Sequence, residues 1–219
     1  MNYDFLGIGD TVIDRFIRLS QAEIKCNEQG ENCKLCLNFA DKVPYEDSYL
    51  VAAVGNSANA AVAASRLGLK SALYANVGDD YYGKLCIETI QKEKVATDFM
   101  IINKGELTNY HYVLWFTDDR TILVKHEKYD YKFREFGEPG WIYLSSMGEN
   151  SLTFHQELEK YLLAHKKIKL AFQPGTFQMK FGKDILKGIY KRTDVFFCNK
   201  EESQRILETK ELDIKKLLK

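Results

Sequence analysis

Two glycine-led turns, each followed by a helix-forming run, constrain the folding of this chain most strongly. The first turn lies at Gly55 and the second at Gly78, and a short β-like run separates them. Glycine lets another chain segment or a ligand approach the backbone closely, and the first amide groups of a helix lack partners within that helix. The pattern therefore predicts strand–turn–helix units with a hydroxyl-rich or anionic small molecule bound at the turns.

The run after Gly55 is rich in alanine and predicts a helix packed closely against a sheet. Asn56 or Ser57 is suited to cap its beginning, and Gly68 is suited to a left-handed C-terminal cap. Asn59 is a polar side chain close to the turn, which the packing of alanines does not explain. It is therefore a candidate for ligand contact.

Strand-like and helix-like patterns alternate along most of the chain. Strands are expected at residues 3–9, 71–77, 141–145, 169–173 and 194–198, and helices at 57–67, 82–93, 151–164 and 180–190. Such alternation predicts right-handed βαβ units, which form a mostly parallel sheet with helices on both faces. Ligands in this architecture bind beyond the carboxyl ends of the strands, where Gly9, Gly78 and Asn199 lie.

Two regions interrupt this alternation. Residues 13–53 contain β-like stretches at 13–17 and 35–39 but no convincing helix. The second region contains a predicted hairpin, with strands at 110–116 and 120–126 around a turn at 117–119. Its first strand is apolar or aromatic on both sides, so both of its faces are expected to be covered.

Four motifs follow one another in an order shared with a known family. The pattern GGxxxNxAxxxxxLG is matched at Gly55, Asn59, Ala61, Leu67 and Gly68, with Val54 in place of the first glycine. The pattern GxVGxDxxG is matched at Val77, Gly78, Asp80 and Gly83, with Ala75 in place of the first glycine. Asp14 follows the first apolar strand, and Asn199 to Glu202 fits NxxE. Together these motifs resemble the ribokinase-like (PfkB) carbohydrate kinases.

The resemblance implies an α/β fold, a three-layer sandwich with a mostly parallel sheet and a small β-sheet lid. The chain would be one kinase domain over residues 1–219, and the lid would comprise about 13–53 and 108–127. Family members often use this lid as a dimer clasp, so a homodimer is a further expectation.

The implied reaction is phosphoryl transfer from ATP to a hydroxymethyl group of a sugar or nucleoside. By resemblance, Asp14 accepts hydrogen bonds from acceptor hydroxyls, and Gly55, Asn56 and Asn59 hold the other side of the acceptor. The structural alternatives are a strand-end turn for Asp14 and a helix-cap network for Asn59. The motifs leave open which sugar or nucleoside is the acceptor.

The NxxE match places Asn199 near the triphosphate, and Glu202 would organise the water shell of Mg²⁺. Magnesium keeps several waters when bound, so one indirect carboxylate is chemically sufficient. Taken alone, the same residues are equally typical of a helix start.

Weaker candidates for substrate contact follow other strand ends: Glu149, Thr176 and Gln178. Many relatives carry an aspartate on the strand where this chain has Gln173, which is uncharged and cannot act as a base.

The chain contains no GAGD, the motif that carries the catalytic base of such kinases. By resemblance, the base aspartate is therefore expected beyond Lys219, and no residue of this stretch is expected to be the base. The chain resembles the amino-terminal two thirds of these kinases with an incomplete ATP lobe, and the 219 residues alone are expected to be inactive.

Two alternatives to a kinase differ in class. One is a non-catalytic small-molecule-binding or interaction protein derived from the kinase fold. The other, a NAD-dependent oxidoreductase, is disfavoured because the run from Gly7 to Val12 lacks the third glycine of GxGxxG.

The amino-acid composition limits the classes of partner that the chain is expected to bind. Lys+Arg and Asp+Glu both number 31, so no net charge attracts nucleic acid or an anionic membrane. The first residues show neither a cationic targeting region nor a long apolar run, which predicts a cytoplasmic protein.

Three of the five cysteines cluster at Cys26, Cys33 and Cys36. The Cys33–Cys36 spacing suits zinc, but no fourth ligand follows nearby, so further ligands would have to come from a second subunit or from His126 or His155 in space. Free thiols are the alternative, and we expect them in a cytosolic protein. Cys86 and Cys198 are expected to be buried apolar residues.

Overall fold

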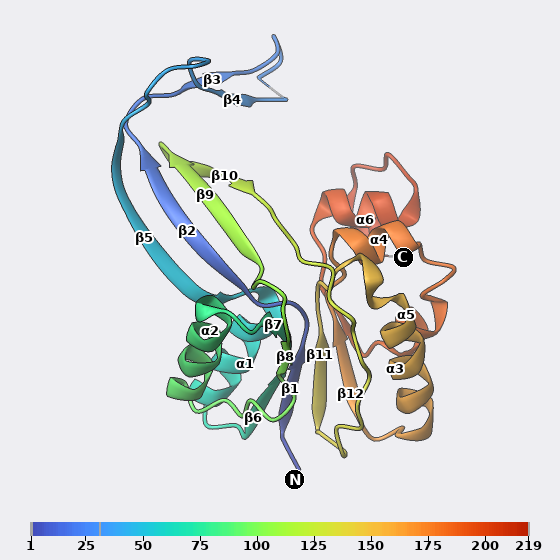
Figure 1. Cartoon of the computed structure of the whole chain (residues 1–219). Coiled ribbons are helices and arrows are strands. Elements are labelled where there is room, and N and C mark those ends of the chain that lie inside the picture. The colour runs from blue at the N-terminus through green and yellow to red at the C-terminus, as the bar shows by residue number, and fades with distance from the viewer. Residues whose placement is uncertain (1, 31, 219) are drawn as a thin grey trace.

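The computed structural model describes residues 2–30 and 32–218, and its core is a parallel sheet of five strands (Figure 1). The strand order is β13-β12-β11-β1-β6, and each neighbouring pair is parallel. The strands are β1 (Phe5–Ile8), β6 (Ser71–Tyr74), β11 (Trp141–Leu144), β12 (Lys169–Phe172) and β13 (Val195–Phe196).

Helices cover both faces of this sheet, which makes three layers (Figure 1). One face carries α1 (Asn56–Arg66) and α2 (Tyr81–Lys92). The other side carries η1 (Glu149–Ser151), α3 (Leu152–Ala164), α4 (Thr176–Phe181), α5 (Lys187–Arg192), α6 (Lys200–Leu207) and α7 (Ile214–Leu217). The predicted α/β fold with a mostly parallel sheet is therefore confirmed.

Alternation along the strands separates two apolar cores. Leu6 and Ile8 on β1 belong to the core that includes Phe154 of α3. Gly7, between them, faces α1, and a Cβ atom there would lie 2.6 Å from the Ser57 carbonyl oxygen. The alanines of α1 and this glycine together let the helix lie directly on the strand, as the sequence predicted.

A second sheet protrudes from the sandwich (Figure 1), and we call it the protruding sheet. Its order is β10-β9-β2-β5, with β2 parallel to β9 and antiparallel to β5. The strands are β2 (Val12–Leu19), β5 (Tyr45–Val54), β9 (Tyr110–Phe116) and β10 (Asp119–Leu123). A small hairpin, β3 (Glu23–Lys25) and β4 (Lys34–Cys36), lies at its far end.

The long strand β5 was not predicted. Its first half is polar and carries no alternation of its own, so the sequence gives little indication of a strand there. Pairing with β2 across seven register positions, from Val12↔Val54 to Leu19↔Tyr45, orders it as an extended segment. The expected stretch at 35–39 shrinks to β4.

Two predicted elements are divided in the structure. The helix expected at 180–190 becomes α4 and α5, because Gly182 adopts a φ of 90° and ends the first of them. The strand expected at 71–77 becomes β6 and β7 (Asn76–Gly78), and β7 pairs with β8 (Ile101–Asn103) instead of the central sheet.

Within this single chain the first hairpin strand is not covered on both faces. On β9 only Val113 is fully buried, and Tyr112 remains 47% exposed. The α2 helix reaches only the base of the protruding sheet, where Tyr82 and Tyr110 meet with ring centroids 5.0 Å apart. The outer part of β9 therefore keeps exposed apolar surface.

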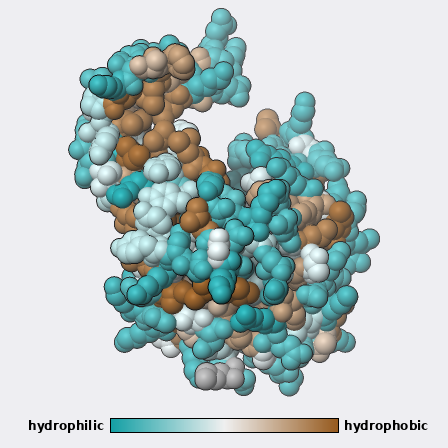
Figure 2. Space-filling view, in the orientation of Figure 1, coloured by the Kyte–Doolittle hydropathy of each residue, from teal (hydrophilic) through white to brown (hydrophobic). Residues whose placement is uncertain are grey.

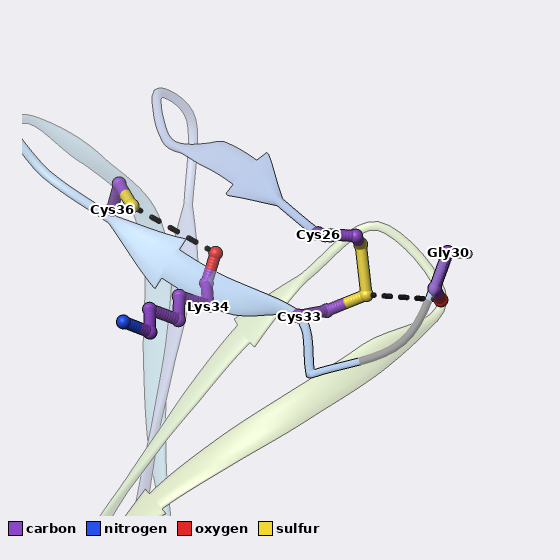
Figure 3. Close-up of a disulfide and its surroundings, with 5 residues drawn as sticks. All are labelled: Cys26, Gly30, Cys33, Lys34 and Cys36. Carbon is purple, nitrogen blue, oxygen red and sulfur yellow. Dashed lines mark hydrogen bonds between the residues drawn. A yellow bond between two sulfur atoms is a disulfide. The ribbon is translucent and has the colours of Figure 1, made fainter. Parts of the chain in front are cut away.

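The cysteine cluster forms a disulfide rather than a metal site or three free thiols. Cys26 and Cys33 are bonded to each other across the β3–β4 hairpin, and Cys36 is free with its thiol directed at the Lys34 carbonyl (Figure 3). Among the described residues no group of three or more His, Cys, Asp or Glu side chains is arranged to hold a metal ion.

The two remaining cysteines differ. Cys86 is buried as expected, and burial raises the pKa of its thiol to about 11. Cys198 is exposed, contrary to the prediction. It follows the two-residue edge strand β13, beyond which no described strand pairs, so nothing covers it.

The expectation that the catalytic base follows Lys219 concerns a part of the protein that the structure does not describe. Lys219 itself lies outside the described residues, which end at Leu218. The expectation therefore stays a prediction. Within residues 2–30 and 32–218, no helix is both long enough and apolar enough to cross a membrane.

Candidate acceptor-binding site

The turn at Gly55 is the structural centre of the site. Gly55 is the N-cap residue of α1 and has a φ of 134°, a conformation that favours glycine. A Cβ atom at this position would lie 2.6 Å from the carbonyl oxygen of Asp10. The absent side chain thus lets the Gly55 turn and the segment after β1 touch, so two strand ends meet at one point.

The predicted side-chain cap is wrong. Neither Asn56 nor Ser57 caps α1, because the N-cap position belongs to Gly55, which has no side chain. Ser57 is instead fully buried, with its hydroxyl 3.5 Å from the Asp10 carbonyl oxygen. Asn56 is exposed as the first residue of the helix.

Asn59 lies one helical turn after Gly55, and its amide donates to the Gly55 carbonyl at 2.8 Å. Its side chain is exposed and makes no hydrogen bond with any residue in the described part of the chain. The helix-cap alternative for Asn59 therefore does not hold, and the carboxamide is available to a ligand.

Asp14 lies within β2 at the base of the protruding sheet, not in a strand-end turn. Its residue is only 8% exposed, and Oδ1 lies 3.3 Å from Nδ1 of His111. The contact follows from the parallel pairing of β2 with β9, which places Asp14 opposite His111. Asp14 Oδ1 is buried without a hydrogen-bond partner, so it can accept a hydroxyl hydrogen.

Asp10 is a second buried carboxylate at this point, directly after β1. Oδ1 accepts a hydrogen bond from the Tyr131 hydroxyl at 2.8 Å, and that hydroxyl accepts one from the Gly148 amide at 2.8 Å. Burial, with the charge of Asp10 adding to it, raises the pKa of Tyr131 far above its ordinary value. Tyr131 therefore remains a protonated donor to Asp10.

The second glycine turn makes several hydrogen bonds within the protein. Asp80 caps α2 by accepting from the Gly83 amide at 2.8 Å, and it also accepts from the Thr108 hydroxyl at 2.6 Å. The Gly78 amide donates to Thr108 Oγ1 at 3.1 Å. These hydrogen bonds satisfy the groups that the sequence analysis offered to a ligand.

The weaker candidates mostly have structural partners. Gln178 is fully buried and bonds the Met147 backbone through both ends of its carboxamide, so it is no substrate contact. Gln173 accepts from the Tyr143 hydroxyl. Glu149 is exposed in η1 and forms an ion pair with Lys128 at 3.0 Å. Thr176 is exposed at the start of α4.

Asn199 and Glu202 form a reciprocal capping box at the start of α6. The Asn199 side chain accepts from the Glu202 amide at 2.7 Å, and Glu202 Oε2 accepts from the Asn199 amide at 2.9 Å. This is the helix-start alternative of the sequence analysis, now observed. It leaves Oε1 of Glu202 outside the cap.

Sequence reasoning missed Asp10, His111 and Tyr131 as members of the site, and it considered His126 only as a zinc ligand. His126 Nδ1 lies 3.6 Å from Asp10 Oδ2. The available signal was position, because both histidines stand near the ends of the predicted hairpin that face the sandwich. Which carboxylate each would meet depended on strand pairing.

Comparison with known proteins agrees with this architecture. The pfkB family carbohydrate kinase profile matches residues 20–219. The chain belongs to this family. The match begins after β1 and Asp14.

Two bacterial sugar kinases show local similarity to this pfkB-family chain. A ribokinase of Bacillus subtilis is 38% identical over 72 residues, which are 32% of this chain and 25% of the relative. A fructokinase of Vibrio alginolyticus is 36% identical over 70 residues, or 32% of this chain and 23% of the relative. The chain thus matches about a quarter of each of these relatives.

Solved structures share the fold along the whole chain. Arabidopsis thaliana ribokinase, complexed with ribose and ATP, superposes with a TM-score of 0.71 at 16% identity. The match covers 100% of this chain and 68% of the ribokinase chain. The Methanocaldococcus jannaschii nucleoside kinase gives a TM-score of 0.69 at 16% identity. The match covers 98% of this chain and 66% of the nucleoside kinase chain. This chain therefore spans about two thirds of these kinases.

Proposed function

We propose that the complete protein transfers a phosphoryl group from ATP to a hydroxymethyl group of a sugar or nucleoside, and that residues 1–219 supply the acceptor half of the site. One observation carries the proposal. The buried carboxylate of Asp14 lies where the protruding sheet joins the sandwich, two residues after Val12, whose partner Val54 directly precedes the Gly55 turn. Strand ends of a parallel sheet are where this architecture binds ligands.

The proposed roles follow from exposure and hydrogen-bonding capacity. Asp14 accepts hydrogen bonds from acceptor hydroxyls, while Asn59 and Asn56 offer exposed carboxamides at the start of α1. The Gly55 backbone keeps this side open for close approach of the acceptor. The protruding sheet acts as a lid over the acceptor, and Glu149 contributes at the edge only when it leaves Lys128.

For the nucleotide, Asn199 and Glu202 are the proposed contacts on this part of the chain. Glu202 keeps one carboxylate oxygen free of its capping hydrogen bond and is only partly buried, which fits an indirect role toward Mg²⁺ through water. When bound, Mg²⁺ neutralises charge on the triphosphate. Glu202 would orient its water shell, and Asn199 would lie near the phosphates.

The first test uses the protein expressed from its full reading frame, with ATP consumption measured against a panel of sugars and nucleosides. Asp14→Asn should lower kcat/KM for the best acceptor about tenfold to hundredfold, because a hydrogen bond to a charged group is lost. Asp130→Asn is the matched control, since Asp130 is exposed and forms an ion pair with Lys132. Equal activity of both variants would contradict the assignment of Asp14.

A companion proposal is that residues 1–219 by themselves do not phosphorylate an acceptor. Family members carry the base aspartate in a GAGD motif that this stretch lacks, so the base is proposed to follow Lys219. Robust acceptor-dependent ATP turnover by this stretch would refute the proposal. Acceptor binding without turnover by the complete protein would instead favour the alternative, a binding protein derived from the kinase fold.

We also propose that the protruding sheet pairs with a second copy of this chain. Figure 2 shows apolar surface gathered over this sheet, and its exposed residues include Tyr112 (47%) and Leu123 (53%), which are register partners on one face. Apolar patches of this kind on one element commonly mark an interface. Sedimentation should show a dimer that Leu123→Lys converts to a monomer. Leu163→Lys, at an equally exposed leucine of α3, should leave it intact.

A further inference from the structure

Four titratable side chains meet where the sandwich joins the protruding sheet. Asp14 Oδ1 lies 3.3 Å from His111 Nδ1, and Asp10 Oδ2 lies 3.6 Å from His126 Nδ1. The two imidazole rings contact each other edge to face, with centroids 5.1 Å apart. Asp10 comes from the end of β1, whereas the others come from β2, β9 and the segment after β10. The cluster therefore lies at the proposed acceptor site, between the sandwich and the protruding sheet.

Every member of this cluster has hydrogen-bonding capacity that the protein leaves unused. Asp10 Oδ2, Asp14 Oδ1, His111 Nε2 and His126 Nδ1 are buried and have no hydrogen-bond partner. Both aspartates are more than nine-tenths buried. Unpaired polar atoms in a protein interior are costly, so several in one place indicate groups that a polar ligand satisfies.

The carboxylates of the cluster have no lysine or arginine partner to balance their negative charge. Neither Asp10 nor Asp14 forms an ion pair or hydrogen bond with a lysine or arginine in the part of the chain that the structure describes. Tyr131 donates to Asp10 as a neutral hydroxyl, and His155 of α3 is kept neutral by burial, which lowers its pKa.

We infer that the acceptor is uncharged and hydroxyl-rich, and that His111 and His126 are specificity-determining residues that exclude anionic acceptors such as sugar phosphates and sugar acids. Imidazole nitrogens and carboxylates exchange hydrogen bonds with hydroxyl groups. A phosphate or carboxylate at the same place would face two carboxylates with no fixed cation beside them. The inference rests on the proposed function and narrows its substrate class.

The test compares matched acceptors on the protein from the full reading frame, with binding followed by calorimetry and turnover by ATP consumption. D-ribose, D-fructose and adenosine serve as neutral probes, and D-ribose 5-phosphate, D-fructose 6-phosphate and D-gluconate as anionic ones. The best neutral probe should bind at least tenfold more tightly than any anionic one. A phosphorylated or acidic probe that binds best and is turned over would overturn the inference while leaving the kinase function in place. No turnover with any probe would overturn the function itself, and the inference with it.

Variants of the histidines test their role separately. His111→Lys and His126→Lys each place a fixed cation beside a carboxylate, and at least one should lower the preference for neutral over anionic probes fivefold or more. His111→Asn keeps a donor toward Asp14 and should retain the original preference. His165→Asn removes a histidine at the end of α3 that bonds the Tyr161 carbonyl, and it should change nothing. An unchanged preference in both lysine variants would remove the histidines from the specificity argument.

Discussion

Gly55 is constrained both by its backbone conformation and by a close contact with Asp10. Its φ of 134° is rarely adopted by other residues, and its α-carbon stands against the Asp10 carbonyl. The residue is thus required both for the turn and for the meeting of two strand ends beneath the lid. Gly68 has a similar φ of 90° but open space around it.

Gly55→Ala should therefore lower the free energy of unfolding by about 2–4 kcal/mol, from backbone strain plus the clash with Asp10. Gly68→Ala is the matched control and should cost only about 1 kcal/mol, since strain acts there alone. Urea denaturation checks both values. Equal losses would mean that the contact with Asp10 relaxes at no cost.

His155 leads to a prediction about how the stability of the fold depends on pH. Burial lowers its pKa below the ordinary 6.5 of a histidine, while Nδ1 lies 2.7 Å from the Ser151 carbonyl oxygen. As the pH falls below 6.5, the unfolded chain binds a proton at this position before the folded chain does. The contribution of His155 to stability is thus complete above that pH and is lost as the pH falls toward its folded pKa.

Unfolding free energy measured from pH 7.5 to 5 should fall with a slope of up to about 1.4 kcal/mol per pH unit from this group. His155→Asn keeps a donor toward Ser151 and should flatten the slope, whereas His165→Asn should not. An unchanged slope in His155→Asn would show that other groups govern acid sensitivity.

At the scale of elements, the start of α6 has two roles, one observed and one proposed. Asn199 and Glu202 cap the helix, and the same carboxylate is the proposed partner of the magnesium water shell. Capping needs only a side-chain acceptor at Glu202, which glutamine also supplies, whereas the metal role needs the charge. One substitution at Glu202 can therefore distinguish helix capping from the magnesium role.

Glu202→Gln should leave the melting temperature within about 2 °C of the parent, because the capping hydrogen bond survives. The magnesium concentration needed for half-maximal turnover by the complete protein should rise several-fold. Glu201→Gln, at the exposed neighbour, is the control and should alter neither quantity. A parental magnesium dependence in Glu202→Gln would leave the motif with a capping role only.

At the scale of the whole molecule, the sandwich and the protruding sheet differ in how their surfaces are covered. The sandwich holds most of the buried apolar residues, while the β3–β4 hairpin at the far end of the protruding sheet has none that is fully buried. Segments with few buried contacts open locally at low free energy. The Cys26–Cys33 bond is the one covalent cross-link between described residues there.

Brief trypsin digestion should therefore cleave first between residues 20 and 44 and leave the sandwich intact. A protease that cleaves after glutamate should cut inside the disulfide loop at Glu28, and the Cys26–Cys33 bond should hold the two fragments together until a reductant is added, which mass spectrometry with and without dithiothreitol can show. First cleavage within α1 or α3 would contradict this distribution of stability.

The expectations that held came from local features. The glycine pattern around Gly55, the alanine-rich helix and the alternation of strands with helices all act through backbone conformation and side-chain periodicity within a few residues. Those that failed depended on partners distant in sequence. The strand β5 needs β2 beside it, the exposure of Cys198 depends on an edge strand, and Asp80 is engaged by Thr108.

The sequence by itself determined the α/β architecture, the family and the candidate residues Asp14, Gly55 and Asn59, because these reside in short motifs with fixed spacing. Only the tertiary structure decided that His111 meets Asp14 and that His126 meets Asp10. The first contact depends on the parallel register of β2 with β9, and the second on how the chain returns from β10 to the sandwich. Neither is encoded in local periodicity, so the charge of the acceptor site emerged only with the fold.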